Sequence, residues 1–297
     1  MYPWLQQMTE QFNQLIATDK MAHAILISGV SGLGKAELAN QLAATLLCSG
    51  AQKPCGSCKS CYLRLANNHP DLLIIDSSAT TVGVDAIRVL SSFLHGSAQQ
   101  QRNKVVVLTD AEKLTEAAAN ALLKTLEEPP AHSYILLTSA AAPLLPATVL
   151  SRCQQWAVAA QFSGVAQSWL EQQATVPVPD YLLSYCGGAP LKALAMLENG
   201  AAENLNTALN CLNGYMRDEV SLTDCVKSVG TIADLTPLLG WYLQQQLLPS
   251  LTEKAAAKQL ALHQLFSRWC RDEKQILGQN KPLALTALLS SLKRLSR

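Results

Sequence analysis

An eight-residue loop, GVSGLGKA at residues 29–36, constrains the fold of this chain more than any other feature. It lies between the apolar run AILIS (24–28) and a segment of helical composition at about 35–47. The loop follows the pattern G-x-x-x-x-G-K-[ST], in which backbone N–H groups and the start of a helix surround a phosphate. We therefore predict a strand, a phosphate loop and a helix, in this order. The residues expected to contact phosphate are Gly29, Gly32, Gly34 and Lys35.

The magnesium-binding parts of this phosphate loop are incomplete. Ala36 stands where a Ser or Thr hydroxyl would ligate Mg²⁺. The run KVVVLTD (104–110) should end in an acidic pair, but it offers Thr109 with Asp110, or Asp110 with Ala111 in the other register. One carboxylate is missing in either register, and hydrolysis depends on an aligned metal and water. We therefore expect ATP or ADP binding to be weak or absent, without turnover.

The first half of the chain alternates runs typical of strands with segments typical of helices. Further strands are expected in DLLIID (71–76), in KVVVLTD and in YILLTS (134–139). Helices are expected in VDAIRVLSSFLHG (84–96) and in TEAAANALLKTLEEPP (115–130), where Thr115 can cap the N-terminus and Pro129-Pro130 end the helix. This alternation predicts a parallel sheet with helices on both faces.

The pattern changes after about Ala160, where strong β runs stop and helical spacing continues. We predict three parts: an α/β domain at 1–160, a small helical lid at 161–201 and an all-helical C-terminal domain at 202–297. In the last part, apolar residues recur at helical spacing, as in Leu285, Leu288, Leu289 and Leu292, and Pro237, Pro249 and Pro282 are expected to interrupt the helices.

Four of the nine cysteines lie within 14 residues: Cys48, Cys55, Cys58 and Cys61. Four thiolates suit a closed structural Zn²⁺ site, so we predict a zinc module at 48–61, inserted after the helix that follows the phosphate loop. Free thiols and an iron–sulfur cluster are the alternatives, although ferredoxin-type runs place their fourth cysteine downstream. The scattered cysteines are expected to be buried small side chains.

Bulk composition excludes several classes of protein. The net charge is +1 and aromatic residues make up 5% of the chain, which argues against strong autonomous binding of nucleic acid. No apolar stretch of 18 residues could form a membrane span, and MYPWLQQMTEQF at the N-terminus lacks the features of a secretory signal. We expect a cytoplasmic protein that has no contact with membranes.

Several segments together resemble the bacterial DNA polymerase III clamp-loader subunits of the AAA+ superfamily. They are HAILISGVSGLGKA (23–36), the four cysteines, HPDLLIID (69–76), VDAIR (84–88), NALLKTLEEPP (120–130) and TVLSRC (148–153). The resemblance covers the N-terminal domain in sequence and the helical remainder only in architecture. It implies a RecA-like AAA+ domain, a helical lid and a C-terminal collar that joins subunits.

Two kinds of subunit share these segments in that family. The motor subunits keep the phosphate-loop Thr and the Asp-Glu pair, whereas the delta-prime kind does not, so Ala36 and Thr109 place this chain with delta prime. The position of a nucleotide-sensing arginine in the motors matches Leu191, next to Lys192. We expect Arg152 to follow the last strand of the sheet. The resemblance implies that this residue is an arginine finger, which acts in trans on the ATP of a neighbouring subunit.

The resemblance also implies partners. We expect a hetero-pentamer with a delta subunit and gamma or tau motor subunits, which places the sliding clamp on primed DNA. The chain would then be a component of the DNA polymerase III holoenzyme without ATPase or polymerase activity of its own. An active motor ATPase of the same fold is the first alternative, and a zinc-dependent nucleic-acid-binding module is the second.

Overall fold

The computed structural model divides the chain into two compact units. One unit contains 1–173 and 186–192, and the other contains 174–185 and 193–297. The residues that the structure describes are 1–77, 80–100, 102–232, 234–247, 256–275, 278 and 280–296. The predicted separation of a lid at 161–201 from a collar at 202–297 divides the chain differently, and it stays a prediction.

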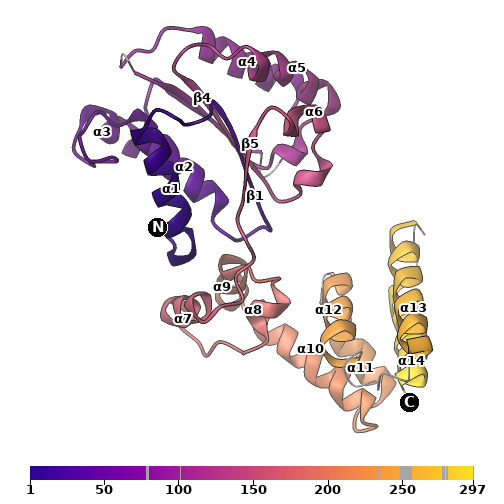
Figure 1. Cartoon of the computed structure of the whole chain (residues 1–297). Coiled ribbons are helices and arrows are strands. Elements are labelled where there is room, and N and C mark those ends of the chain that lie inside the picture. Colours follow the sequence, from indigo (N-terminus) through magenta and orange to yellow (C-terminus); the bar gives the residue numbers. More distant parts are fainter. Residues whose placement is uncertain are drawn as a thin grey trace. The chain divides into compact units, whose positions relative to one another are not determined.

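The first unit is built on a sheet of five parallel strands in the order β2-β3-β4-β1-β5 (Figure 1). The strands are β1 Ala24–Ser28, β2 Leu72–Ile75, β3 Lys104–Leu108, β4 Ser133–Ser139 and β5 Gln154–Ala157. The runs predicted as strands form β1 to β4, and all residues of β3 are buried as its continuous apolar composition indicates.

The edge strand β5 was not predicted, and it corrects the placement of Arg152. This arginine precedes β5 in the chain and therefore does not follow the last strand of the sheet. The sequence of β5, QQWA, has no apolar run, and both of its glutamines are exposed. Pairing with β1 holds this segment in the sheet, which periodicity alone cannot reveal.

Helices cover both faces of the sheet, as the alternation predicted (Figure 1). Alternate residues of one strand enter opposite cores: Ile25 and Ile27 pack on the face of α1 and α2, and Leu26 packs on the face of α4 and α5. The bounds are α1 Gln6–Ala17, α2 Lys35–Leu47, α4 Val84–His95 and α5 Glu116–Glu127.

Local capping fixes the ends of these helices. The hydroxyl of Thr115 accepts a hydrogen bond from the Ala118 N–H, which confirms the predicted cap of α5. Gly96 follows α4 in an extended conformation. The smaller elements of this unit are η1 Pro3–Leu5, α3 Lys59–Leu65, η2 Ala111–Lys113, η3 Ala142–Leu144, α6 Ala147–Leu150 and α7 Gly164–Gln173.

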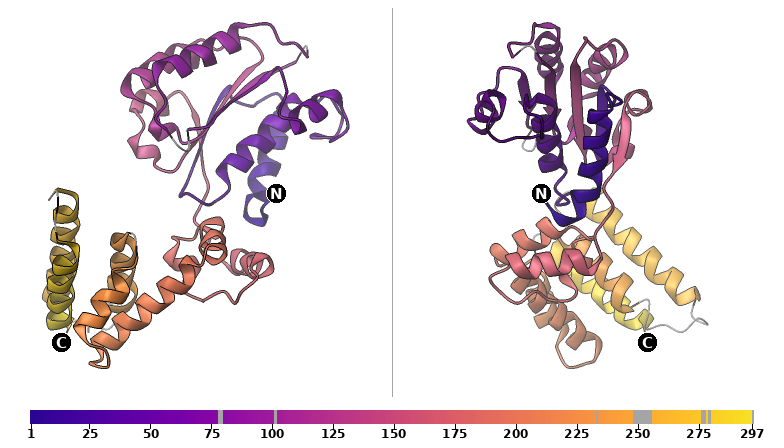
Figure 2. Two further views of the ribbon diagram at one scale, coloured as in Figure 1. Left: turned by 180° about the vertical axis from the view of Figure 1, so that it is seen from behind. Right: turned by 60° about the vertical axis from the view of Figure 1, so that its left-hand side comes forward.

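All secondary-structure elements among the described residues of the second unit are helices (Figure 2). It contains α8 Leu182–Tyr185, α10 Ala201–Met216, α11 Leu222–Val229, α12 Leu235–Tyr242, the π-helical turn η4 Leu243–Leu247, α13 Ala256–Gln275 and α14 Lys281–Ser296, while α9 Pro190–Glu198 crosses between the units. The four leucines predicted to form one apolar face of α14 are all buried.

Prolines in this unit begin helices where we expected interruptions. Pro237 lies in the first turn of α12 and Pro282 in the first turn of α14. Proline is tolerated there because the first N–H groups of a helix have no partner within it. Pro249 lies outside the described residues. Among the described helices, none combines the length and the apolar character that a membrane span requires.

Candidate functional sites

The three glycines of the phosphate loop adopt backbone conformations that side chains disfavour. Their φ angles are +146° at Gly29, +88° at Gly32 and +84° at Gly34. Gly34 directly precedes α2, so the loop leads into a helix N-terminus as the motif predicts. The loop therefore has the backbone geometry of a phosphate cradle.

Other parts of the first unit pack closely against these glycines. A Cβ on Gly32 would lie 2.8 Å from the backbone nitrogen of Lys192, and a Cβ on Gly34 would lie 2.5 Å from the ring of Tyr2. The Leu191 N–H also donates to the Gly32 carbonyl at 3.1 Å. The segment expected to carry a nucleotide sensor thus contacts the loop through its backbone.

A cavity of about 390 Å³ opens beside the loop at the carboxyl ends of the central strands. Its lining includes Lys35, Ala36, Thr109, Asp110 and Leu191. The fold therefore brings the residues of the phosphate loop and of the expected acidic pair to one cavity. Ala36 contributes a methyl group to it at the position of the motif hydroxyl. Both registers of the acidic pair place Asp110 at this cavity.

Lys35 is 7% exposed, and its Nζ donates a hydrogen bond to the Val30 carbonyl of the same loop at 3.0 Å. Burial lowers the pKa of its amine, and the nearby carboxylates of Glu112, Asp110 and Glu37 oppose this shift. The lysine is thus engaged by its own loop, which reduces its availability to a phosphate.

The side chains at the end of β3 are engaged by neighbouring residues. The hydroxyl of Thr109 donates to an Asp76 carboxylate oxygen at 3.2 Å, and Asp110 forms an ion pair with Lys113 at 3.3 Å. Asp76 also lines the cavity, and we did not single it out from the sequence. Its signal was its position at the end of the run DLLIID, since parallel strands end at one edge of the sheet.

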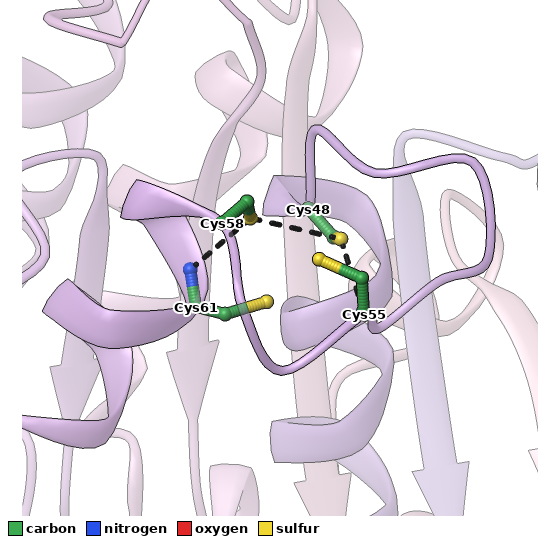
Figure 3. A group of neighbouring side chains, drawn as sticks. All are labelled: Cys48, Cys55, Cys58 and Cys61. Carbon is green, nitrogen blue, oxygen red and sulfur yellow. Dashed lines mark hydrogen bonds between the residues drawn. The ribbon is translucent and has the colours of Figure 1, made fainter.

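The sulfur atoms of Cys48, Cys55, Cys58 and Cys61 all lie within 4.8 Å of one another, and their side chains point to a common centre (Figure 3). The Cys48 and Cys58 sulfurs are 3.9 Å apart. Tetrahedral Zn–S bonds of about 2.3 Å imply sulfur separations of about 3.8 Å. This four-cysteine cluster could therefore hold one metal ion.

Backbone N–H groups support the sulfurs before any metal is considered. The N–H groups of Gly50 and Cys55 each donate to the Cys48 sulfur at 3.3 Å. The Cys61 N–H donates to the Cys58 sulfur at 3.4 Å (Figure 3). The last bond also caps α3. The sequence did not identify Gly50 as part of this cluster. A Cβ at this position would lie 2.7 Å from the Cys55 Cβ, so a larger residue would displace Cys55.

The thiols of the cluster differ in how readily they ionise. A hydrogen bond from the Ser49 side chain is the main cause that lowers the pKa of Cys58 to about 5, whereas burial raises the pKa of Cys61 to about 12. Several thiolates at this spacing repel one another, so a bound dication would be needed to stabilise the full set. The donor set therefore fits a thiophilic dication.

Arg152 lies on a part of the first unit that does not line the cavity beside the phosphate loop. It follows α6, and its Nη2 pairs with Oε1 of Glu127, the last residue of α5, at 2.6 Å. Its Nη1 donates to the Thr148 carbonyl at 2.9 Å and to the Ser151 hydroxyl at 3.2 Å. The guanidinium is thus oriented by three neighbours while its side chain stays about one-third exposed, at 34%.

The scattered cysteines are mostly buried. Cys153, Cys186 and Cys225 are buried, whereas Cys211 and Cys270 are partly exposed. Burial raises the pKa of Cys153 to about 11, so its thiol stays protonated near neutral pH and is a poor nucleophile. These properties favour a structural role for Cys153 beside Arg152.

Comparisons with known proteins place these sites in context. Residues 4–161 match the model of a family described as "DNA polymerase III, delta subunit". The DNA polymerase III subunit delta' of Haemophilus influenzae is 41% identical over 68% of this chain and 63% of its own length. That of Yersinia pestis is 35% identical over 98% of this chain and 94% of its own.

Among solved structures, a DNA polymerase III gamma subunit-related protein from Thermotoga maritima is 18% identical to this chain. The alignment covers 97% of this chain and 99% of that protein, with a TM-score of 0.49.

Proposed function

Since this chain belongs to the family of DNA polymerase III delta-prime subunits, we propose that it is the non-hydrolysing subunit of a clamp loader. The observation that carries this proposal is the cavity beside the phosphate loop, where Ala36 and Thr109 replace groups that would hold magnesium. Without that metal, the charge that develops during phosphoryl transfer is not stabilised.

We further propose that Arg152 serves a neighbouring motor subunit as an arginine finger in trans. A guanidinium is always charged and presents its donors in a rigid fork, which suits a transferring phosphoryl group. Three anchoring contacts, including the pair with Glu127, orient the fork within this subunit. Its partial exposure and its separation from the chain's own phosphate loop favour action on another subunit.

The four-cysteine cluster is proposed to hold structural Zn²⁺. All four ligands come from the protein, so no coordination position stays open for a substrate. The metal would stabilise the connection between α2 and α3 without taking part in the reaction. The phosphate loop, through Gly29, Gly32, Gly34 and Lys35, is proposed to bind ATP or ADP weakly or not at all.

The proposed assembly is a cytoplasmic hetero-pentamer with a delta subunit and gamma or tau motor subunits. Within it, the lid at 161–201 and the collar at 202–297 would hold this chain in the ring. The ring would load the sliding clamp onto primed DNA, and this chain would meet the clamp only indirectly.

The test is an Arg152→Ala substitution in the reconstituted complex. Loss of an arginine finger costs about 10³- to 10⁵-fold at the affected ATP site. We expect DNA-dependent ATPase and clamp loading to fall while the complex still assembles. Arg88→Ala is the matched control, because Arg88 is exposed and pairs only locally with Asp85. Unchanged ATPase in the Arg152 variant would refute the role in trans.

An active motor subunit is the competing function, favoured by the surviving glycines and Lys35. Purified chain free of partners should not hydrolyse ATP above background. Turnover at a motor-like rate would favour the competing function and would refute a non-hydrolysing role.

A further inference from the structure

A second cavity, of about 330 Å³, lies beside the edge strand β2. It is lined by Arg64, Asn67, His69, Leu72 and Ile74, and we refer to it as the edge cavity. Arg64 belongs to the last turn of α3, and residues 66–71 connect this helix to β2. Asn67 adopts a left-handed conformation with φ +51°, which turns the connection around the cavity. Neither the phosphate loop nor the four-cysteine cluster accounts for this arrangement.

His69 presents a buried hydrogen-bond donor at the edge cavity. The residue is 6% exposed, and its Nδ1 accepts a hydrogen bond from the Asp71 N–H at 3.1 Å. A neutral imidazole that accepts at Nδ1 carries its proton at Nε2. Burial is the main cause that lowers the pKa of His69, so the ring is neutral near pH 7. Its Nε2 is buried and has no hydrogen-bond partner among the described residues.

Arg64 adds a second buried donor of the same kind. Its Nε is also buried and has no hydrogen-bond partner within the described part of the chain. The guanidinium is a permanent cation with donors only. Buried polar groups in folded proteins nearly always have partners, so two such donors on residues that line one cavity indicate that something accepts from them.

The charged side chain in the described lining of the edge cavity is the cation Arg64, while Asp71 and the Cys58 sulfur act electrostatically on His69 from outside this lining. No carboxylate is among the lining residues that the structure describes. Asp71 is next to His69 in space, but its two carboxylate oxygens accept from the Gln99 and Gln100 N–H groups at 2.8 Å and 2.7 Å. The acidic group nearest in the chain is thus occupied by a loop, and the positive charge of Arg64 has no acidic side chain opposite it in the cavity.

The size and walls of the edge cavity suit a group larger than one water molecule. A water occupies about 30 Å³ of liquid, which is far less than this volume. Leu72 and Ile74 project from the same face of β2, because side chains alternate along a strand. These two side chains form an apolar wall, so the lining side chains that can donate are Arg64, Asn67 and His69. A tetrahedral oxyanion can accept from donors that come from different directions.

We propose that the edge cavity binds a phosphate group, with Arg64 Nε and His69 Nε2 as its donors. The phosphate is either a free ion or part of a nucleic-acid backbone, and the chemistry that recognises it is the same. This site lies outside the phosphate loop, although the two cavities share Ile74 in their linings, and it does not depend on the proposed clamp-loader function.

The test uses the full chain with ¹⁵N-labelled histidine, since only five histidines contribute signals. Inorganic phosphate is titrated at constant ionic strength and pH, and the ring nitrogens are observed by NMR. We expect a free chain whose His69 signals show the proton at Nε2, and a saturable shift of the Nε2 signal as phosphate binds. An oligothymidylate without terminal phosphates provides the second arm. If it displaces phosphate, the site takes backbone phosphates, and if it does not, the site takes free phosphate.

Three variants complete the test. Arg64→Gln removes the cation, and the phosphate-induced shift of the His69 signal should be lost or need at least tenfold more phosphate. His69→Asn keeps an acceptor for the Asp71 N–H but removes the Nε2 donor, and calorimetry should show weaker phosphate binding. Lys59→Gln removes one exposed charge from α3 without touching the cavity lining, so phosphate binding should be unchanged.

Two results would overturn the proposal. The first is the absence of a saturable shift at tens of millimolar phosphate, which would mean that the cavity holds ordered water only. The second is a shift of equal size in Arg64→Gln and in Lys59→Gln, which would reflect general screening of charge. Circular dichroism and metal content of each variant establish that the fold is retained.

Discussion

Helix α2 joins two sites that differ in completeness. It begins at Lys35 of the phosphate loop and is followed at its other end by Cys48 of the four-cysteine cluster. The cluster has its full set of ligands from one stretch of 14 residues, and backbone N–H groups already support the sulfurs. The phosphate loop keeps its backbone shape, but Ala36 presents a methyl group at the position of the motif hydroxyl, and one carboxylate of the expected acidic pair is missing after β3.

This difference indicates that packing alone can favour the residues of a phosphate-loop motif. Gly32 accommodates the backbone of Lys192, Gly34 accommodates the ring of Tyr2, and Lys35 bonds to the Val30 carbonyl. Each of these contacts would favour the same residues even without a nucleotide. In the four-cysteine cluster, backbone N–H groups contact the sulfurs as well, but the close approach of four sulfurs also fits the ligand set of one metal ion.

The largest effect is expected at the complete site. Cys58→Ser removes one ligand, so bound zinc should fall from one ion per chain to none. Structural zinc contributes about 10–16 kcal/mol in isolated zinc-finger peptides, and the segment 48–61 should therefore lose its fold. Elemental analysis and limited proteolysis would measure both effects.

Cys211→Ser is the control for this prediction, because Cys211 lies in the other unit and outside the cluster. Zinc retained at full stoichiometry by Cys58→Ser would break the comparison, since the cluster would then not need all of its thiols.

A smaller effect is expected from restoring one missing group at the incomplete site. Ala36→Thr supplies the absent hydroxyl, and a hydrogen bond or ligand to a charged group is worth about 1.5–3 kcal/mol. In this variant, Mg²⁺ should therefore raise the ATP affinity by about 10- to 100-fold. Calorimetry with and without the metal would measure this increase. The unaltered chain serves as reference and should respond equally in both conditions. If the ATP affinity of the variant does not respond to Mg²⁺, the missing hydroxyl at position 36 does not explain the loss of magnesium binding, and Thr109 becomes the residue to change next.

The smallest effect concerns packing around the phosphate loop. Gly32→Ala adds a methyl group against the backbone of Lys192, in a conformation with φ +88°. Overpacking of this kind costs about 1–3 kcal/mol, and it should appear as a lower melting temperature without nucleotide. Gly164→Ala is the matched control, because a Cβ there meets nothing within 4 Å. Equal melting temperatures for the two variants would mean that packing does not explain the retained glycine.

Four of the five strands and three of the helices that cover the sheet, α2, α4 and α5, could be predicted from the sequence. Buried parallel strands such as β3 are continuous apolar runs, and helix ends such as Thr115 carry their own capping groups. The helix α1 and the strand β5 escaped prediction. β5 has little apolar character of its own, and its pairing partner β1 is more than a hundred residues away in the chain.

The sequence by itself determined the phosphate loop, the grouping of four thiols and the absence of a hydroxyl at Ala36, because each depends on residues a few positions apart. Only the tertiary structure brought Asp76 to Thr109, Glu127 to Arg152 and Lys192 to Gly32. The partners in these contacts are 25 to 160 residues apart in the chain. Parallel strands bring distant loops to one edge of the sheet, and spacing along the chain does not specify which residues of these loops contact one another.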